Sequence, residues 1–202
     1  AHVAGNTNSN NFPRTAVAYD TTYNQGTDSY LTKFNQNGSA LIFSTFMGTA
    51  GGTINGVAVD NQNITYVVGT APAQIFTASP DALQANYAGP PGPVPPPGDA
   101  FVLAFNEAGT ARLYASYFGG TTTDTGNCIF VDESRNVYFG GQTNSIITDA
   151  RPFPTTAGVF KEFMVLDLLT PPALPDGFLI KNKIIVPTSL ASITIINPAS
   201  AI

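Results

Sequence analysis

The stretch GSALIFSTFMG, residues 38–48, returns 71 positions later (109 − 38) as GTARLYASYFG, residues 109–119. The two copies share an opening glycine, an alanine, an aromatic pair and a closing glycine. Both alternating sets of side chains are apolar or small, whereas a strand with one side in water alternates apolar with polar residues. We therefore expect equivalent strands in repeated units, with Phe43 and Tyr114 covered by neighbouring sheets.

Three further landmarks recur in a fixed order around this strand. The first landmark is a strand that ends in glycine, at Gly5, Gly69 and Gly141. The second is a corner with Phe and Pro, at residues 12–13, 76–80 and 153–154. The third is an Asp that opens an apolar strand, at Asp28, Asp99 and Asp176. The Asp residues are spaced by 71 (99 − 28) and 77 (176 − 99). Short segments rich in Val, Ile, Phe, Tyr and Thr between Gly, Asn, Asp and Pro are typical of strands joined by turns.

These patterns predict an all-β protein. We expect a single domain, residues 1–202, containing units of approximately 1–60, 61–132 and 133–202. Sheets covered on both faces are found in β-propellers, so we expect a propeller-like array of about three four-stranded antiparallel blades.

The repeat resembles the seven-bladed β-propeller repeat family, which occurs mostly in large secreted bacterial proteins. The resemblance is carried by DAFVLAF, GTARLYASYFGG, IFVDESRNVYFGG and PFPTTAGVF within residues 99–160, and more loosely by DSYLTKF, GSALIFSTFMG and GVAVDNQNITYVVG. It implies four-stranded blades around an axis. The units here carry inserts at 89–99 and 168–176, and three sheets are fewer than a propeller ordinarily uses to close.

The C-terminal segment, residues 187–202, is predicted to form an apolar strand. Its candidate assembly residues are Leu190, Ile193, Ile195 and Ile196. An exposed apolar edge recruits a partner strand. Two outcomes remain open: the segment closes the last sheet beside the N-terminal strand of its own chain, or it enters a neighbouring subunit and builds a filament by strand donation.

The charge pattern excludes two classes of partner. The chain has 8 basic and 13 acidic residues, and its charged fraction of 10% is well below the roughly 25% of ordinary domains. No basic cluster is present, which argues against nucleic acid or an anionic membrane as a partner. No apolar run reaches the roughly 20 residues of a membrane-spanning helix. A start at Ala1 without Met fits a processed secreted protein, so we expect an extracellular or cell-surface location.

Two triplets match the N-glycan acceptor pattern, at Asn37 and Asn63. Asn-rich turns also produce such triplets by chance, so both interpretations stay open. Cys128 is the only cysteine and lies in the apolar strand GNCIFVD, where we expect a small buried hydrophobic residue.

Candidates for catalysis are few. His2 is the only histidine and lies at the terminus, which argues against a Ser-His-Asp arrangement and against a conventional zinc site. Asp28, Asp99 and Asp176 precede strands, while Asp60 and Asp132 follow them. Such recurrent carboxylates either bind a ligand or accept backbone N–H groups in repeated turns, and we favour turns. We predict no catalytic residues, no metal site and no cofactor.

Two functional hypotheses follow. The first is a non-enzymatic extracellular structural or assembly protein that self-associates through terminal strands into a surface or filamentous polymer. The second is a secreted binding module that recognises glycan or protein; Tyr23, Tyr30 and Tyr87, near predicted turns, are its candidates for stacking on sugars. A hydrolase that relies on paired carboxylates is a third, weaker hypothesis.

Overall fold

The computed structural model describes residues 1–24, 26–49, 51–89, 98–146, 148–157 and 175–184. These residues form ten β-strands and no helix, so the predicted all-β class is confirmed. No helix in this part of the chain has the length and apolar character needed to cross a membrane.

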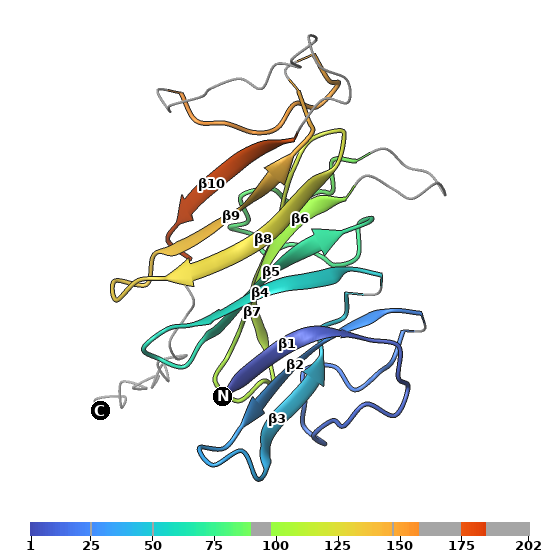
Figure 1. Ribbon diagram of the computed structural model, residues 1–202, viewed down its shortest axis with the longest axis vertical. Coiled ribbons are helices and arrows are strands. Elements are labelled where there is room, and N and C mark those ends of the chain that lie inside the picture. Colours follow the sequence, from blue (N-terminus) through green and yellow to red (C-terminus); the bar gives the residue numbers. More distant parts are fainter. Residues whose placement is uncertain (25, 50, 90–97, 147, 158–174, 185–202) are drawn as a thin grey trace, which may run out of the picture.

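The strands pair into three antiparallel sheets (Figure 1). The first sheet contains β1 (His2–Thr7), β2 (Asp28–Phe34) and β3 (Leu41–Phe46), in that order. The second sheet contains β4 (Thr53–Val59), β5 (Thr65–Ala71), β6 (Asp99–Phe105) and β7 (Arg112–Phe118). The third sheet has the order β10-β9-β8, from β8 (Asp124–Val131), β9 (Val137–Thr143) and β10 (Asp176–Asn182).

The expectation of three four-stranded sheets is met only by the second sheet, because the described residues give three, four and three strands. The sheet boundaries also differ from the sequence units. β4 falls in the first sequence unit, yet it pairs with β5 from Val59↔Thr65 onward and therefore belongs to the second sheet. The third sheet likewise begins with β8, which pairs with β9. Each unit boundary thus lies between two paired strands, because the tight turn after Asp60 or Asp132 folds the chain back on itself.

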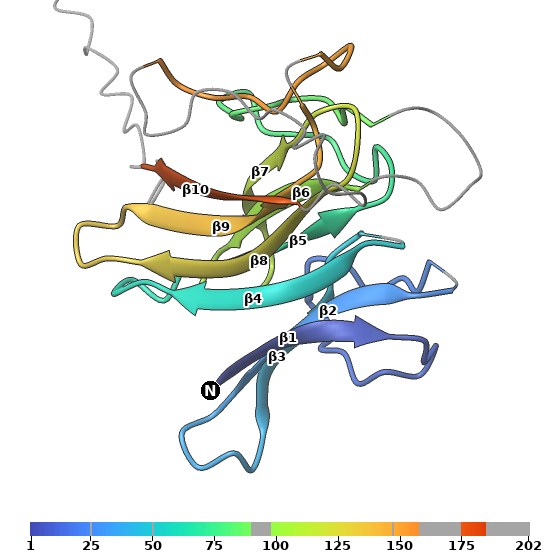
Figure 2. The same ribbon diagram turned by 45° about the horizontal axis from the view of Figure 1, so that its top comes forward.

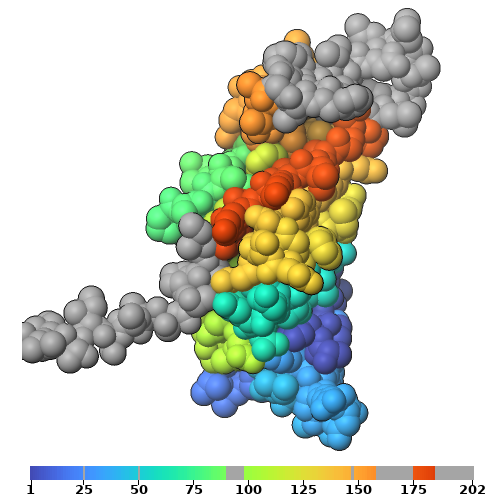
Figure 3. Space-filling model, turned by 90° about the vertical axis from the view of Figure 1, so that its left-hand side faces the viewer, coloured from blue at the N-terminus to red at the C-terminus, as the bar shows by residue number. Residues whose placement is uncertain are grey.

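The three sheets stack face to face, with the second sheet in the middle (Figures 1 and 2). The sequence colours accordingly advance from blue at one end of the molecule to orange and red at the other (Figure 3). One hydrophobic core joins the first and second sheets through Leu31, Phe43, Val67, Leu103 and Tyr117, and others. A second core joins the second and third sheets through Tyr66, Val68, Tyr114, Val137 and Phe139, and others. The described sheets form an open stack and no closed ring.

The repeated strand is β3 (LIFSTF) in the first sheet and β7 (RLYASYF) in the second. Phe43 is 2% exposed and Tyr114 is 1% exposed, as predicted, but Ile42 of β3 is 51% exposed, so the expectation that both faces are covered fails for β3. A loop also runs along the outer edge of each strand: the N–H of Thr15 donates to the carbonyl of Ser44 at 3.0 Å, and the N–H of Ser79 donates to that of Ala115 at 2.9 Å. These loops supply the backbone hydrogen bonds that an edge strand otherwise lacks.

The Phe-Pro corners occupy the same place in every sheet. Each corner ring packs on the aromatic residue two positions after the opening Asp: Phe12 on Tyr30 at 4.3 Å between centroids, Phe76 on Phe101 at 5.7 Å, and Phe153 on Phe178 at 4.8 Å. Each corner therefore fixes the chain that leads into the next Asp-initiated strand by aromatic packing.

Candidate functional site

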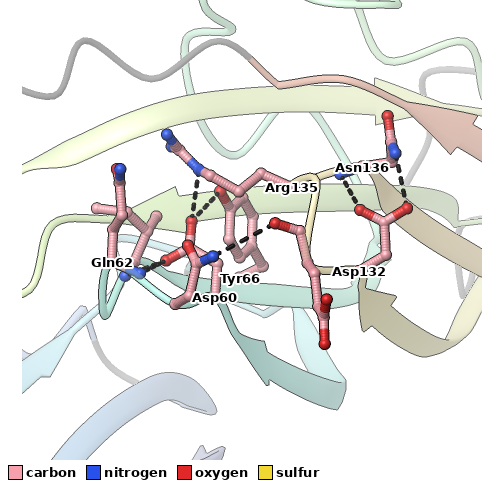
Figure 4. Close-up of polar contacts among 9 residues, drawn as sticks. Asp60, Gln62, Tyr66, Asp132, Arg135 and Asn136 are labelled. Atoms are coloured by element: carbon pink, nitrogen blue, oxygen red, sulfur yellow. Dashed lines mark hydrogen bonds and ion pairs between the residues drawn. The ribbon is translucent and has the colours of Figure 1, made fainter.

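Polar side chains join the second and third sheets at the turns after β4 and β8 (Figure 4). Asp60 first organises its own turn, because its Oδ1 accepts the N–H groups of Gln62 and Ile64, both at 2.9 Å. An Asp side chain in this position replaces a backbone turn partner. The turn is tight enough to place Asn63 at a φ of 60°.

The second carboxylate oxygen of Asp60 connects the two sheets. It accepts a hydrogen bond from Nε of Arg135 at 2.9 Å, across 75 positions of sequence, and another from the hydroxyl of Tyr66 at 3.1 Å (Figure 4). The Asp60 side chain is fully buried, so the guanidinium compensates a charge that water does not reach. Burial, followed by the charge of Asp60, raises the pKa of Tyr66 to about 12, which keeps its hydroxyl protonated as a donor.

Asp132 repeats half of this arrangement in the third sheet. It accepts hydrogen bonds from the N–H of Asn136 at 2.8 Å, from the side-chain amide of Asn136 at 2.6 Å and from the hydroxyl of Tyr138 at 3.1 Å. The hydrogen bond from the Asn136 side chain is the main cause that lowers the pKa of Asp132. Within the described part of the chain, Asp132 has no cationic partner equivalent to Arg135.

Replacing Arg135 by Ala is expected to lower the free energy of unfolding by about 2 kcal/mol, because it leaves a buried carboxylate without its charged donor. Urea unfolding followed by circular dichroism measures the change. The matched control is Glu107→Ala, since Glu107 pairs with Lys33 at 3.6 Å between the first and second sheets but is largely exposed. That pair is expected to contribute less than about 1 kcal/mol. Equal losses in the two variants would contradict the assignment.

A second polar site brings Asp99 and Asp124 together where β6 and β8 begin. Both side chains are buried, and both carboxyl groups lie within 2.8 Å of the position that a Cβ on Gly119 would take. Asp99 accepts the N–H of Ala88 at 2.6 Å and the side-chain amide of Gln84 at 3.2 Å through one oxygen. Its other oxygen is buried without a hydrogen-bond partner among the described residues.

Asp124 is more completely hydrogen-bonded. The hydroxyl of Thr143 donates to one oxygen, while the N–H of Gly120 at 2.7 Å and the hydroxyl of Ser145 at 3.0 Å donate to the other. Burial raises the pKa of Asp124 to about 6 against these donors. Burial also raises the pKa of Asp99 to about 7, assisted by the charge of Asp124 and opposed by the hydrogen bond from Ala88.

These shifts predict that the protein loses stability as the pH rises. A carboxyl group whose pKa is higher in the folded than in the unfolded state binds more protons when folded, so its contribution is complete below the unfolded value of 3.8 and is lost as the pH passes about 6 to 7. We expect a decrease of a few kcal/mol in the free energy of unfolding between about pH 4 and pH 8. Asp99→Asn is expected to remove part of this slope, with Asp81→Asn, at an exposed position, as the control. A stability that rises over this range would contradict the prediction.

Other candidate residues occupy varied places. Asp28 accepts the N–H groups of Ser29 at 2.9 Å and Asn24 at 3.1 Å, as the turn interpretation expects. Asp176 begins β10. His2 is part of β1 and half-buried beside Phe43 rather than at a loose terminus; burial, then the charge of Lys33, lowers its pKa. The described residues contain no group of three His, Cys, Asp or Glu side chains suited to a metal ion.

The predicted modification and assembly residues divide into two groups. Asn37 and Asn63 are both exposed in turns, where a glycan would meet no steric obstacle from a core. The assembly residues Leu190, Ile193, Ile195 and Ile196 lie outside the described residues, as does the rest of the segment 187–202. The three tyrosines proposed for sugar stacking are partly exposed and each contacts another aromatic ring: Tyr23 lies 5.9 Å from Phe46, Tyr30 lies 4.3 Å from Phe12, and Tyr87 lies 6.5 Å from Tyr117, between ring centroids.

The prediction that Cys128 is buried is wrong. It is exposed because it lies on the outward face of β8, away from the second sheet. Phe130 and Leu179 share this outer face and are 63% and 76% exposed. We refer to the face carrying Cys128, Phe130, Tyr138, Leu179 and Lys181 as the third-sheet end face.

Among the described residues, no sheet covers the opposite end of the stack either. A cavity of about 270 Å³ opens on the outer side of the first sheet, lined by Val3, Phe12, Pro13, Tyr30, Thr32, Phe34, Leu41 and Ser44. Val3 is 41% exposed in it. We refer to this surface as the first-sheet end face. Sequence reasoning missed both end faces, although their signal was present: apolar residues on both sides of strands in the terminal units.

Fold and sites together define an all-β repeat protein in which equivalent antiparallel sheets stack through apolar faces. The second and third sheets are also joined by the polar contacts of Asp60 with Tyr66 and Arg135, which we call the polar seam. No protein-family model matches the chain, and a comparison with curated proteins finds no significant similarity.

Proposed function

We propose that this protein is a non-catalytic, extracellular assembly protein, whose stack of β-sheets is extended by further sheets in a propeller-like or filamentous structure. The observation that carries the proposal is an apolar sheet face at each end of the stack that no other described sheet covers, represented by Val3 at one end and by Phe130 and Leu179 at the other.

Uncovered sheet faces of this kind favour association because their burial removes apolar area from water. The low charge of the chain, 10% of residues, adds little repulsion between copies. The extracellular location is supported by the resemblance to repeats of secreted proteins and by the exposure of Asn37 and Asn63 in glycan acceptor triplets.

The oligomeric state of the 202-residue protein in solution tests the proposal. Light scattering coupled to size exclusion, over a range from micromolar to hundreds of micromolar, is expected to give multiples of 21.1 kDa that grow with concentration. Negative-stain microscopy shows whether the product is a ring or a fibre. A constant mass of 21.1 kDa over the whole range contradicts self-assembly.

Removal of residues 187–202 tests the proposed role of the C-terminal strand separately. If this segment is donated to a neighbour, the truncated chain is expected to give a mass near that of one subunit while remaining folded. If the truncated chain still forms the same polymer, strand donation is not the connection between subunits.

A binding function has one observation in its favour. The insert between β5 and β6 forms a cavity of about 470 Å³ lined by Gln74, Ile75, Phe76, Thr77, Ala78, Ala85 and Asn86. A glycan or peptide ligand of a monomeric protein would bind there. Titrations with oligosaccharides, followed by NMR chemical shifts or by tyrosine fluorescence, distinguish this function from assembly. Binding by a strictly monomeric chain favours the binding module.

A further inference from the structure

We infer that the partner of each end face is a second copy of this chain, bound head to tail, so that the third-sheet end face of one copy covers the first-sheet end face of the next. This inference rests on the proposed assembly function and specifies its interface. It follows from comparing each end face with the equivalent, covered face inside the stack.

The third-sheet end face has covered equivalents in both other sheets. Leu179 occupies in β10 the position that Leu31 occupies in β2 and Val102 in β6, counted from the opening Asp of each strand. Leu31 and Val102 are 0% exposed because the next sheet lies over them, whereas Leu179 is 76% exposed. The third sheet therefore presents the kind of face that the first two sheets use to bind their following neighbour.

The first-sheet end face is equivalent to the faces that the other sheets turn toward their preceding neighbour. Val3 precedes Gly5 by two residues, as Val67 precedes Gly69 and Phe139 precedes Gly141. Val67 and Phe139 are buried against the preceding sheet, but Val3 is partly exposed in the cavity beside Tyr30 and Thr32. The first sheet therefore presents the kind of face that the other two sheets use to bind their preceding neighbour.

Each internal seam joins one face of each kind, so the two end faces complement each other and neither complements itself. A second copy supplies the missing face at either end, which makes the contact heterologous. Two copies joined at both ends would contain six sheets (3 + 3), within the range at which β-propellers close.

Charge is compatible with this pairing. In the first seam, Lys33 of β2 reaches Glu107 in the turn between β6 and β7 at 3.6 Å. Lys181 is the equivalent lysine of β10, and Gln36 is the equivalent residue in the turn between β2 and β3. The proposed contact thus brings Lys181 near the neutral oxygen acceptor of Gln36 in the second copy, without like-charge repulsion.

Two single-face variants and their mixture test the inference. Leu179→Asp damages only the third-sheet end face, and Val3→Asp damages only the first-sheet end face. Each variant alone is expected to have a mass of 21.1 kDa, because its intact face finds no partner. An equimolar mixture is expected to give twice this mass, since the intact third-sheet end face of Val3→Asp binds the intact first-sheet end face of Leu179→Asp. Val17→Asp, at a loop residue that is exposed and outside both faces, is the matched control and is expected to assemble like the wild type.

Cys128 provides a second measurement that requires no variant. It lies on the third-sheet end face, so its alkylation by a maleimide is expected to slow several-fold as the wild-type concentration rises. The rate for Leu179→Asp is expected to stay constant.

The outcomes separate the inference from the proposed function. If the wild type assembles but the single-face variants assemble equally well, or if their mixture stays monomeric with unchanged Cys128 reactivity in the wild type, head-to-tail pairing is wrong while self-assembly stands. If the wild type itself is monomeric throughout, the proposed function fails and the inference fails with it.

Discussion

Gly141→Ala is expected to destabilise the protein by at least about 3 kcal/mol, the loss typical of severe overpacking in a core. A Cβ at this position would overlap the carbonyl oxygen of Thr125 and contact the ring of Phe178. Neither strand is free to retreat, because β9 is the central strand of the third sheet and pairs with β8 on one side and β10 on the other.

The same effect is expected for Gly69→Ala in the second sheet. Gly69 is the repeat equivalent of Gly141, and its Cβ would overlap the carbonyl oxygen of Thr53 and approach the ring of Phe101 at 2.9 Å. Neither glycine ends its strand as the sequence predicted, because β5 continues to Ala71 and β9 to Thr143. The paired strand has a register shift opposite each glycine, and its backbone approaches too closely there for any side chain, which explains why the sequence repeats this residue.

Gly177→Ala is the matched control for both variants. It lies in β10 of the same third sheet, and the nearest atom to its Cβ is the carbonyl oxygen of Gly141 at 3.9 Å. We expect a change within about 0.5 kcal/mol. Urea unfolding by circular dichroism measures all three variants, and a small loss in Gly141→Ala would show that the backbone of β8 does not approach Gly141 as closely as described.

Tyr117→Ala is expected to lower the free energy of unfolding by about 4 kcal/mol, as for other fully buried aromatic residues. Its ring stacks on Phe76 at 4.1 Å with planes 3° apart, and its hydroxyl satisfies both backbone groups of Phe76: it accepts the N–H at 2.8 Å and donates to the carbonyl at 3.0 Å. Burial, the main cause, raises the pKa of Tyr117 to about 12, so the hydroxyl remains a donor at physiological pH.

Tyr117→Phe separates the hydroxyl from the ring. It leaves the buried N–H of Phe76 without its acceptor, while the Phe76 carbonyl still accepts the side-chain amide of Gln74 at 3.0 Å, and is expected to lose about 1 to 3 kcal/mol. Tyr138→Phe is the control, because its hydroxyl donates to Asp132 at 3.1 Å at a partly exposed site and its loss is expected to stay below about 1 kcal/mol. If Tyr117→Phe is as stable as the wild type, the hydroxyl does not anchor the corner at Phe76.

The stacked sheets suggest why the polar seam at Asp60 is repeated only in part. Asp60 accepts a hydrogen bond from Arg135 of the following sheet. Asp132 occupies the equivalent position in the third sheet and accepts hydrogen bonds from its own turn. Asn63 holds the position of Arg135 one unit earlier, with a φ of 60° against 63°. The left-handed backbone is thus a requirement of the turn, while the arginine is an addition that links one particular pair of sheets.

The carboxylates show the limit of reasoning from the sequence. The turn interpretation of the recurrent carboxylates describes Asp28, Asp60 and Asp132, which accept backbone N–H groups within four positions. It is wrong for Asp99, which accepts the N–H of Ala88, 11 positions away. The pairing of Asp99 with Asp124 was not accessible in this way, since it joins the starts of two strands in different sheets. Their raised pKa values depend on burial, which the local sequence does not express.

The sequence by itself determined the all-β class and the repeat, because strand alternation and turn residues are local properties that recur with each unit. It also determined the burial of Phe43 and Tyr114, since large aromatic side chains in an apolar strand pack against the neighbouring sheet. Only the tertiary structure decided which strands share a sheet and which faces stay open: Leu31, Val102 and Leu179 are alike in sequence position, yet only Leu179 is exposed. Burial is a property of the neighbour that lies over a residue, and that neighbour is set by the place of the sheet in the stack.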